Sequence, residues 1–266
     1  MPDEAPEGRQ LLWLDETSSE IGQAGGAPAQ FFVMTAESPC PYLPGQWERK
    51  LVTELHGPEA EMHNSRLSRA GFRRSHYYAY RPACRSCRAC VPVRIVTGPF
   101  RHSKSQRRTW QRNADLLATL REPIATREQY ELFRHYLLSR HADGEMATMT
   151  WDDYRRMVEE TAVRSLLVEF RDAAGSLVAA CLADCLDDGI SAVYSFFRTD
   201  EPARGLGNYC ILWLAEECRR RELPYLYLGY WIAGSPKMAY KARFHSLEIL
   251  SSGGWQAAER GQANET

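Results

Sequence analysis

Three cysteines lie within seven residues of this 266-residue chain, and a fourth lies upstream on a turn flanked by prolines. Four thiolates can hold zinc in a tetrahedral site or an iron–sulfur cluster, and the spacing does not separate the two metals. Neighbouring arginines are expected to favour the thiolate form, because positive charge lowers the pKa of a thiol. The alternative is a set of reduced, exposed thiols in a basic loop. The predicted metal ligands are Cys40, Cys84, Cys87 and Cys90, and the neighbouring arginines are Arg81, Arg85 and Arg88.

The segment from Met62 to Ala114 contains thirteen Arg or Lys residues and no Asp or Glu. Its charge is +13, so the rest of the chain carries −14 to give the net charge of −1. Such a block repels itself unless an anion lies against it, and nucleic-acid phosphate is the usual anion. The alternative is a basic surface whose arginines pair with carboxylates from the acidic remainder.

The common nucleotide-binding and hydrolase motifs are absent: there is no Walker loop, dinucleotide-binding GxGxxG, HExxH or GxSxG. A shorter glycine pair, Gly205 and Gly207, lies between a predicted strand at Ile190–Arg198 and a helix that begins near Asn208. Backbone N–H groups at such a helix start can hold a phosphate or a developing oxyanion. A purely structural turn is the alternative.

The elements that would position these residues follow from hydrophobic periodicity and turn residues. In the first half, strands are predicted at Leu11–Leu14, Phe31–Met34, Trp47–Leu55, Tyr77–Tyr80 and Val93–Val96, and helices at Ala60–Ala70 and from the Ser103 cap to Asp115. In the second half, helices are predicted at 127–141, after Thr150, from Gly205 to Arg221 and at Pro236–Phe244. The strands predicted there are Ser165–Arg171, Leu177–Cys185, Ile190–Arg198, Tyr225–Trp231 and Leu247–Leu250. Four cysteines on apolar faces are expected in the core: Cys181, Cys185, Cys210 and Cys218.

This pattern predicts a fold that is α+β in composition and mixed α/β in architecture. We expect a Cys-cluster, basic domain at 10–100, a second domain at 101–255, and flexible tails at 1–9 and 256–266. No apolar run reaches 18 residues and the N-terminus lacks an export signal, so we expect a cytoplasmic protein with no membrane association.

Longer motifs resemble one family. They are Cys40-Pro41-Tyr42-Leu43, Gly71-Phe72-Arg73-Arg74-Ser75, Arg81–Arg94, Ser103–Arg108, Ser191–Phe197, Gly205–Gly207, Tyr227–Tyr230 and Met238–Phe244. Over residues 10–255 the chain resembles the bacterial aminoacyl-tRNA–protein transferases, relatives of eukaryotic arginyltransferase, in the aspartate/glutamate leucyltransferase branch. The resemblance implies a C-terminal domain of the acetyltransferase (GNAT) type that binds the aminoacyl end of tRNA rather than acetyl-CoA. It also implies transfer of leucine from its tRNA to proteins that begin with Asp or Glu, which marks them for N-end-rule degradation.

On this basis the candidate catalytic residues are Tyr194, Gly207 and Asn208. The candidate acceptor-binding residues are Arg74, Arg81 and Tyr230, since the planar fork of an arginine binds a carboxylate bidentately. The candidate tRNA contacts are Arg94, Lys104, Arg107, Arg108, Arg112, Lys237, Lys241 and Arg243. For the predicted helix that carries the last three, a solvated cationic face is the alternative.

Two residues depart from the family pattern. Leu43 stands where the eukaryotic relatives have a second cysteine, so their ligand set does not transfer position by position. His76 stands where relatives have glycine, so the local turn is expected to differ.

Three other functions compete with leucine transfer. Arginine could be the donated residue, because the sequence alone does not decide the donor. An acetyl-CoA-dependent N-acetyltransferase would leave the +13 block unexplained, and a non-catalytic zinc-knuckle RNA-binding protein would leave the second half without a role. The oligomeric state is likewise not predicted.

Overall fold

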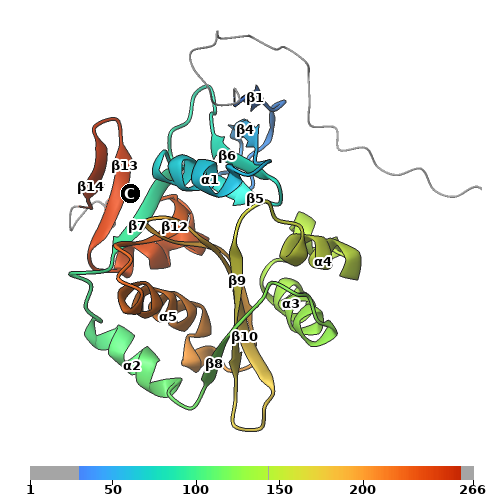
Figure 1. The fold of residues 1–266 in the computed structure, drawn as a ribbon, viewed down its shortest axis with the longest axis vertical. Helices are drawn as coiled ribbons and strands as arrows, with labels where there is room; N and C mark the ends of the chain where they lie inside the picture. The colour runs from blue at the N-terminus through green and yellow to red at the C-terminus, as the bar shows by residue number, and fades with distance from the viewer. Residues whose placement is uncertain (1–29, 143, 259–266) are drawn as a thin grey trace, which may run out of the picture.

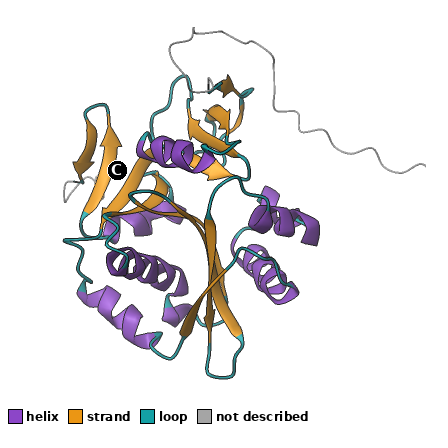
Figure 2. Cartoon of the chain, in the orientation of Figure 1, coloured by secondary structure: helices purple, strands orange, loops and turns teal. Residues whose placement is uncertain are grey.

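An eight-stranded sheet forms the centre of the protein, and Figure 2 shows helices on both of its sides. The computed structural model describes residues 30–142 and 144–258. All neighbouring strands are antiparallel except β11 and β12, which are parallel. In order across the sheet the strands are β14 (Gly254–Ala257), β13 (Leu247–Ser251), β7 (Val91–Val96), β12 (Tyr225–Trp231), β11 (Gly189–Phe197), β10 (Leu177–Cys185), β9 (Ser165–Arg171) and β8 (Leu117–Arg121).

Two pairs of helices cover the faces of this sheet (Figure 1). Helices α5 (Leu206–Arg220) and α2 (Lys104–Arg112) lie on one side, and α3 (Arg127–Arg140) and α4 (Trp151–Glu159) lie on the other. Strand β10 is buried on both faces: Cys181 packs in the cluster that includes α5, and Leu182 packs in the cluster that includes α3 and α4. This two-sided burial explains why the strand is an almost unbroken apolar run. In the described part of the chain, no helix combines the length and the apolar character needed to cross a bilayer.

Helix starts confirm the predicted capping residues. The Ser103 hydroxyl accepts a hydrogen bond from the backbone N–H of Gln106, whose side chain accepts one from the N–H of Ser103. Thr150 and Asp153 form the same reciprocal arrangement at α4. Each such box satisfies orphan donors at a helix start.

A smaller unit lies above the sheet in Figure 1 and contains the N-terminal elements. Its four-stranded sheet has the order β1, β4, β6, β5, and α1 packs against it through a small core around Leu55, Leu67 and Phe72. The bounds of these elements are β1 Val33–Met34, β4 Lys50–Glu54, β6 Tyr78–Pro82, β5 Arg73–Ser75 and α1 Ala60–Arg69. A two-stranded ribbon, β2 (Ser38–Pro39) and β3 (Trp47–Glu48), carries the turn at Cys40.

The structure differs from the sequence-based expectations at several elements. Strand β7 falls inside the predicted 10–100 domain, yet it lies between β13 and β12 in the large sheet, so residue 100 does not separate the two sheets. The predicted strand Trp47–Leu55 is divided at Arg49, and Gln256 and Ala257 form part of β14 rather than a tail. The sequence did not predict four short elements: strands β5 and β8 and the 3-10 helices η1 (Glu145–Thr148) and η2 (Pro202–Arg204). The helix predicted at Pro236–Phe244 is a 3-10 helix, η3 (Pro236–Arg243). The predicted strand Leu11–Leu14 and tail 1–9 lie outside the described residues.

A buried ion pair attaches the small unit to the large sheet. Arg74 on β5 donates from Nε to Oδ2 of Asp184 at 2.7 Å and from its second terminal nitrogen to Oδ1 at 2.6 Å. The Ser165 hydroxyl donates to the same carboxylate at 2.8 Å, and the other guanidinium nitrogen donates to the His76 carbonyl. The side chains of Arg74 and Asp184 are 2% and 1% exposed. His76 has a φ of 52°, the left-handed conformation that favours glycine, so its backbone keeps a glycine-like turn.

Replacing Arg74 by Met should lower the free energy of unfolding by about 3–5 kcal/mol, because it leaves the buried charge of Asp184 without a partner. Urea unfolding measures this. The matched control is Arg69→Met, since Arg69 pairs with Asp187 at the surface and its loss should cost about 1 kcal/mol or less. Equal losses for the two variants would contradict a special role for the buried pair.

Candidate active site

The two parallel strands of the large sheet separate soon after they meet. Strands β11 and β12 pair only from Gly189–Ser191 to Tyr225–Tyr227. Their described residues then run on to Phe197 and Trp231 without pairing to each other. Backbone carbonyls that would have been bonded across the two strands therefore need other donors.

Two cationic side chains supply these donors. Arg73, from β5, donates from one terminal nitrogen to the carbonyl of Ala192 at 3.0 Å and to that of Val193 at 2.8 Å. Lys241, from η3, donates from Nζ to the carbonyls of Leu228 at 2.8 Å and Tyr230 at 2.5 Å. Each separated strand is thus bonded to a cation from a distant part of the chain.

Gly229 makes room for Arg73 between the strands. A Cβ at this position would lie 2.6 Å from the Cδ, Nε and one terminal nitrogen of Arg73, and the φ of Gly229 is +70°. The register between β12 and β7 also shifts between Tyr227 and Gly229. Glycine is therefore required both by the backbone conformation and by the close approach of the guanidinium.

The environment of Lys241 favours its neutral form. Burial, and then the nearby positive charge of Arg73, lower its pKa to about 7 from its ordinary value of 10.5. A neutral amine has two N–H donors, and two carbonyls accept from Nζ. Lys241 can therefore satisfy both carbonyls without carrying a charge.

Tyrosine side chains from four segments of the chain lie near this point. Burial raises the pKa of Tyr194, and the neighbouring phenols of Tyr136 and Tyr42 raise it further. Burial also raises the pKa of Tyr240, while Arg73 opposes this. Among the residues that the structure describes, none forms a hydrogen bond with the hydroxyls of Tyr42, Tyr194 or Tyr240. The point where β11 and β12 separate thus carries the guanidinium of Arg73, the amine of Lys241 and three phenol hydroxyls that have no hydrogen-bond partner in the described chain.

The start of α5 abuts the end of β11. Gly205 precedes the helix with a φ of 64°, and no side chain caps the first turn. A Cβ on Gly207 would lie 2.9 Å from the ring of Phe197, the last residue of β11, so glycine allows the helix to pack this closely. The first N–H groups of a helix have no partner within it, so those of Gly207 and Asn208 can bind an oxygen atom next to the separated strands.

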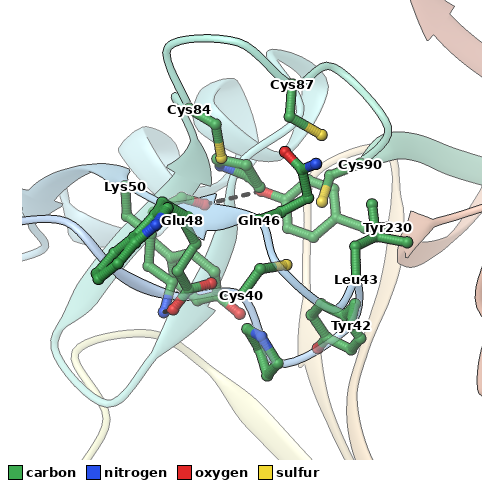
Figure 3. A pocket seen from close by; sticks show the side chains of 14 residues that line it. Cys40, Tyr42, Leu43, Gln46, Glu48, Lys50, Cys84, Cys87, Cys90 and Tyr230 are labelled. Carbon is green, nitrogen blue, oxygen red and sulfur yellow. Dashed lines mark hydrogen bonds and ion pairs between the residues drawn. The ribbon is translucent and has the colours of Figure 1, made fainter.

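The four predicted metal ligands line a single pocket of about 80 Å³, together with Tyr42 and Tyr230 (Figure 3). Burial raises the pKa of Cys90 to about 12, and the thiols of Cys84, Cys40 and Cys87 add to this. The expected lowering by the arginines is therefore not found at Cys90. Arg88 donates instead to the carbonyls of Cys84 and Cys87, and Arg85 pairs with Glu37. In the described ranges, no three His, Cys, Asp or Glu residues are already arranged to hold a metal ion.

Several residues predicted to bind substrate are committed inside the protein. Arg74 is held by Asp184, and the Tyr230 hydroxyl donates to the carbonyls of Gly71 at 2.9 Å and Tyr80 at 3.0 Å. We therefore do not retain Arg74 as the acceptor residue or Tyr230 as a direct acceptor contact. Arg81 is exposed, with its guanidinium over the Phe72 ring.

Arg94 and Lys241 are likewise internal rather than phosphate-binding. Arg94 donates to Glu248 at 2.8 Å, and its guanidinium stacks over the rings of Tyr225 and Trp255. Its side chain is 7% exposed, which removes it from any phosphate surface. Lys241 is bonded within the sheet, and the side chain of Lys237 lies outside the described set.

The other predicted tRNA contacts form an exposed basic surface. We call it the α2 basic face, and it consists of Lys104, Arg107, Arg108 and Arg112. No carboxylate from residues 30–142 or 144–258 pairs with any of them. The exposed Arg243 lies close by, since the Gln106 side chain donates to its carbonyl. Of the thirteen basic residues between Met62 and Ala114, only Arg69, Arg74, Arg85 and Arg94 pair with a carboxylate in the described chain. A basic surface neutralised by acids therefore accounts for a minority of the block.

Residue-level reasoning did not identify Arg73, Tyr42, Tyr136 or Tyr240 as site residues. One feature of the sequence could have indicated Arg73: it lies beside Arg74 in a short strand. Consecutive strand residues point to opposite faces, so the two arginines must have different surroundings. The tyrosines come from separate elements, and only the fold brings them together.

Comparison with known proteins gives consistent matches over most of the chain. The family model described as "Arginine-tRNA-protein transferase, N terminus" matches residues 38–108, and the corresponding C-terminus model matches residues 128–251. The aspartate/glutamate leucyltransferase of Rhodospirillum rubrum is 54% identical over 234 residues, covering 87% of this chain and 95% of the relative. That of Granulibacter bethesdensis is 51% identical over 236 residues, covering 89% and 88%. Among solved structures, L-PGS from Bacillus licheniformis is 13% identical with a TM-score of 0.43 over 54% of this chain and 47% of that one, too distant a likeness to support an argument.

The pH dependence of stability should reveal Lys241. Its pKa in the folded protein lies below its ordinary value, so between pH 7 and 10.5 the unfolded chain binds more protons than the folded one. The free energy of unfolding should therefore rise with pH in this window, by up to about 1.4 kcal/mol per pH unit. In Lys241→Met this contribution is absent, so the difference between wild type and variant should widen from pH 7 to pH 9 in urea unfolding. Lys104→Met controls for loss of an exposed charge, and a constant difference for Lys241→Met would contradict the assignment.

Proposed function

This chain belongs to the aspartate/glutamate leucyltransferase family, and we propose from this premise that it transfers leucine from leucyl-tRNA to the α-amino group of proteins that begin with Asp or Glu. The observation that carries the proposal is the identity of about one half to named leucyltransferases, over most of both chains. Both halves of the protein are matched, so an RNA-binding module with an idle second half is not favoured.

The chemistry requires little beyond positioning. The neutral amine attacks the carbonyl carbon of the aminoacyl ester; a C–N bond forms, the ester C–O bond breaks, and the terminal tRNA oxygen leaves with a proton. The ester is already activated, so a covalent enzyme intermediate is not needed. An α-amino group has a pKa of about 7.7–8.0, so roughly a tenth to a sixth is neutral at pH 7. The protein must then orient the two substrates and stabilise the oxyanion.

The place where β11 and β12 separate suits this task. A parallel pair that parts beside a helix start is the arrangement expected of a GNAT-type acyltransferase, and it supports that interpretation of the second half. In our proposal the N–H groups of Gly207 and Asn208 bind the oxyanion. The high pKa of Tyr194 keeps its phenol protonated, so its hydroxyl can donate to the departing oxygen.

The α2 basic face is proposed to hold the tRNA. Its four cations are exposed and free of carboxylates within the described chain, as phosphate contacts should be. Gln106 on the same helix contacts the end of η3, the element that carries Lys241 to the separated strands. A tRNA bound along α2 would therefore lie next to an element of the site.

We also propose that the four-cysteine pocket binds a metal. The donor set of four thiols suits zinc or an iron–sulfur cluster, and the effect of three thiols on the pKa of Cys90 places all four near one another. Bound there, a metal would fasten the turn at Cys40 to the loop that carries Cys84, Cys87 and Cys90. Its contribution would be to hold the wall that includes Tyr42 and Tyr230.

The experiment that tests the function uses total tRNA charged with amino acids and peptides that begin with Asp, Glu, Lys or Arg. Mass spectrometry identifies the residue that is added. Addition of leucine to the Asp and Glu peptides alone is expected. Addition of arginine, the donor in the name of the matched family models, would correct the donor, and no addition from any tRNA would refute the proposal.

Charge reversal on the α2 basic face should weaken tRNA binding. In the double variant Arg107→Glu/Arg108→Glu, the affinity for leucyl-tRNA should fall, and its dependence on salt should become shallower by about one unit of slope for each lost phosphate contact. Filter binding across a salt series measures both quantities. Arg155→Glu on α4, across the sheet from α2, is the matched control (Figure 1). An affinity that is independent of salt in the wild type would contradict the assignment.

Metal content should follow the cysteine pocket. Protein purified without oxygen should contain zinc, or iron with sulfide, and Cys87→Ser should lose it. Cys185→Ser, outside the pocket, should retain it. Elemental analysis and thiol titration measure this, and four reactive pocket thiols in native protein without metal would exclude the site.

A further inference from the structure

Arg73 is a half-buried cation without an anion. One of its terminal nitrogens is bonded to the carbonyls of Ala192 and Val193. For its Nε and its other terminal nitrogen, the part of the chain that the structure describes offers no hydrogen-bond acceptor, and no carboxylate there forms an ion pair with it. Its basic neighbour in the site, Lys241, is buried and also lacks a carboxylate partner in the described chain. An unpaired guanidinium in a poorly solvated place favours the binding of an anion.

We propose that Arg73 binds the side-chain carboxylate of the acceptor's N-terminal Asp or Glu and thereby sets the class of protein that is modified. This inference rests on the proposed function and adds the residue that recognises the acceptor. With one terminal nitrogen bonded to the protein, the guanidinium still offers its positive charge and the N–H groups of Nε and the other terminal nitrogen to a carboxylate.

The fold holds Arg73 where the acceptor must lie. Arg74 points to the opposite face of β5, where its bidentate pair with Asp184 fixes the strand on the large sheet. Arg73 is thereby fixed at the point where β11 and β12 separate, against Gly229. The acceptor's α-amine must reach the aminoacyl ester at this point, and in Asp or Glu the carboxylate is only a short side chain away from that amine.

The neighbours of Arg73 suit a carboxylate. Burial raises the pKa values of Tyr42 and Tyr240, and the positive charge of Arg73 partly opposes this rise, so both phenols lie close to Arg73. Their hydroxyls have no hydrogen-bond partner in the described chain. Both can donate to a carboxylate oxygen. An anion bound here would also offset the effect of Arg73 that lowers the pKa of Lys241.

A tRNA phosphate is the competing anion for Arg73. The exposed arginines of the α2 basic face are proposed to bind phosphates, and Figure 1 shows α2 at the lower left, away from β5 at the upper edge of the large sheet. Arg73 differs from them in being half-buried and fixed by two carbonyls. These differences favour the carboxylate, and tRNA affinity tests the alternative.

The experiment compares peptides that differ only in the first residue, Asp against Asn and Glu against Gln. The kcat/KM for leucine transfer is measured for wild type, Arg73→Met, Arg73→Lys and Arg66→Met. Fluorescence polarisation measures binding of the same peptides. In Arg73→Met the use of Asp and Glu peptides should fall roughly ten- to a hundredfold, the effect of one hydrogen bond between charged groups. The Asn and Gln peptides should change little, so the preference for acids disappears. Arg66→Met, an exposed arginine of α1 that pairs with no carboxylate in the described chain, should keep the preference.

Folding is monitored by urea unfolding, because Arg73 also bonds two backbone carbonyls. If Arg73→Met does not fold, Arg73→Lys is used for the test. It keeps a charge and one donor nitrogen but loses the planar guanidinium, so it should lose part of the preference for acids. An unchanged preference in the folded Arg73 variants, a lost preference in Arg66→Met, or weakened tRNA binding in Arg73→Met would each overturn the proposal. Wild-type enzyme that transfers no leucine at all would instead refute the proposed function.

Discussion

The need to satisfy backbone carbonyls where β11 and β12 separate governs the arrangement of the site. The strands pair at only three positions, and beyond them each must bond to something other than the other strand. Water would be the simplest partner, but this protein uses Arg73 and Lys241. Cations placed for a structural reason thereby enter the space where substrates meet. The same bonds that complete the sheet give the site its charge.

The short strand β5 connects the point where β11 and β12 separate to the small unit. Strand β5 has three residues, and its two arginines serve opposite faces. Arg74 is neutralised by a buried carboxylate, whereas Arg73 is not, although both have the same chemistry. The difference lies in what the large sheet offers on each side: Asp184 of β10 on one, and bare carbonyls of β11 on the other. Tyr230 of β12 is a second attachment between the small unit and the large sheet. Its hydroxyl donates to the carbonyls of Gly71, before β5 in the chain, and Tyr80, after it.

Local features of the fold could be predicted from the sequence, and remote pairings could not. The caps at Ser103 and Thr150, the apolar strand β10 and the turn before α5 each depend on a few adjacent residues. The gathering of four cysteines in one pocket also agreed with their spacing. The roles of Arg74, Arg94 and Lys241 depend on Asp184, Glu248 and the carbonyls of β12, far along the chain. Charged residues are assumed to be exposed unless a partner is known, so these three were assigned to ligands. For Arg94 a hint existed, since it interrupts the apolar run of β7.

The position of β7 has a consequence for synthesis of the protein. This strand is made early, yet both of its neighbours, β12 and β13, come from the last part of the chain. During synthesis both edges of β7 stay unpaired until nearly all of the polypeptide has emerged from the ribosome. Such non-local pairing slows folding and leaves strand edges exposed to aggregation in the meantime. Arg94 places a charge within this unpaired strand, and an inward-pointing charge disfavours pairing with another chain. Once β13 pairs with β7, Glu248 accepts a hydrogen bond from Arg94 and neutralises this charge.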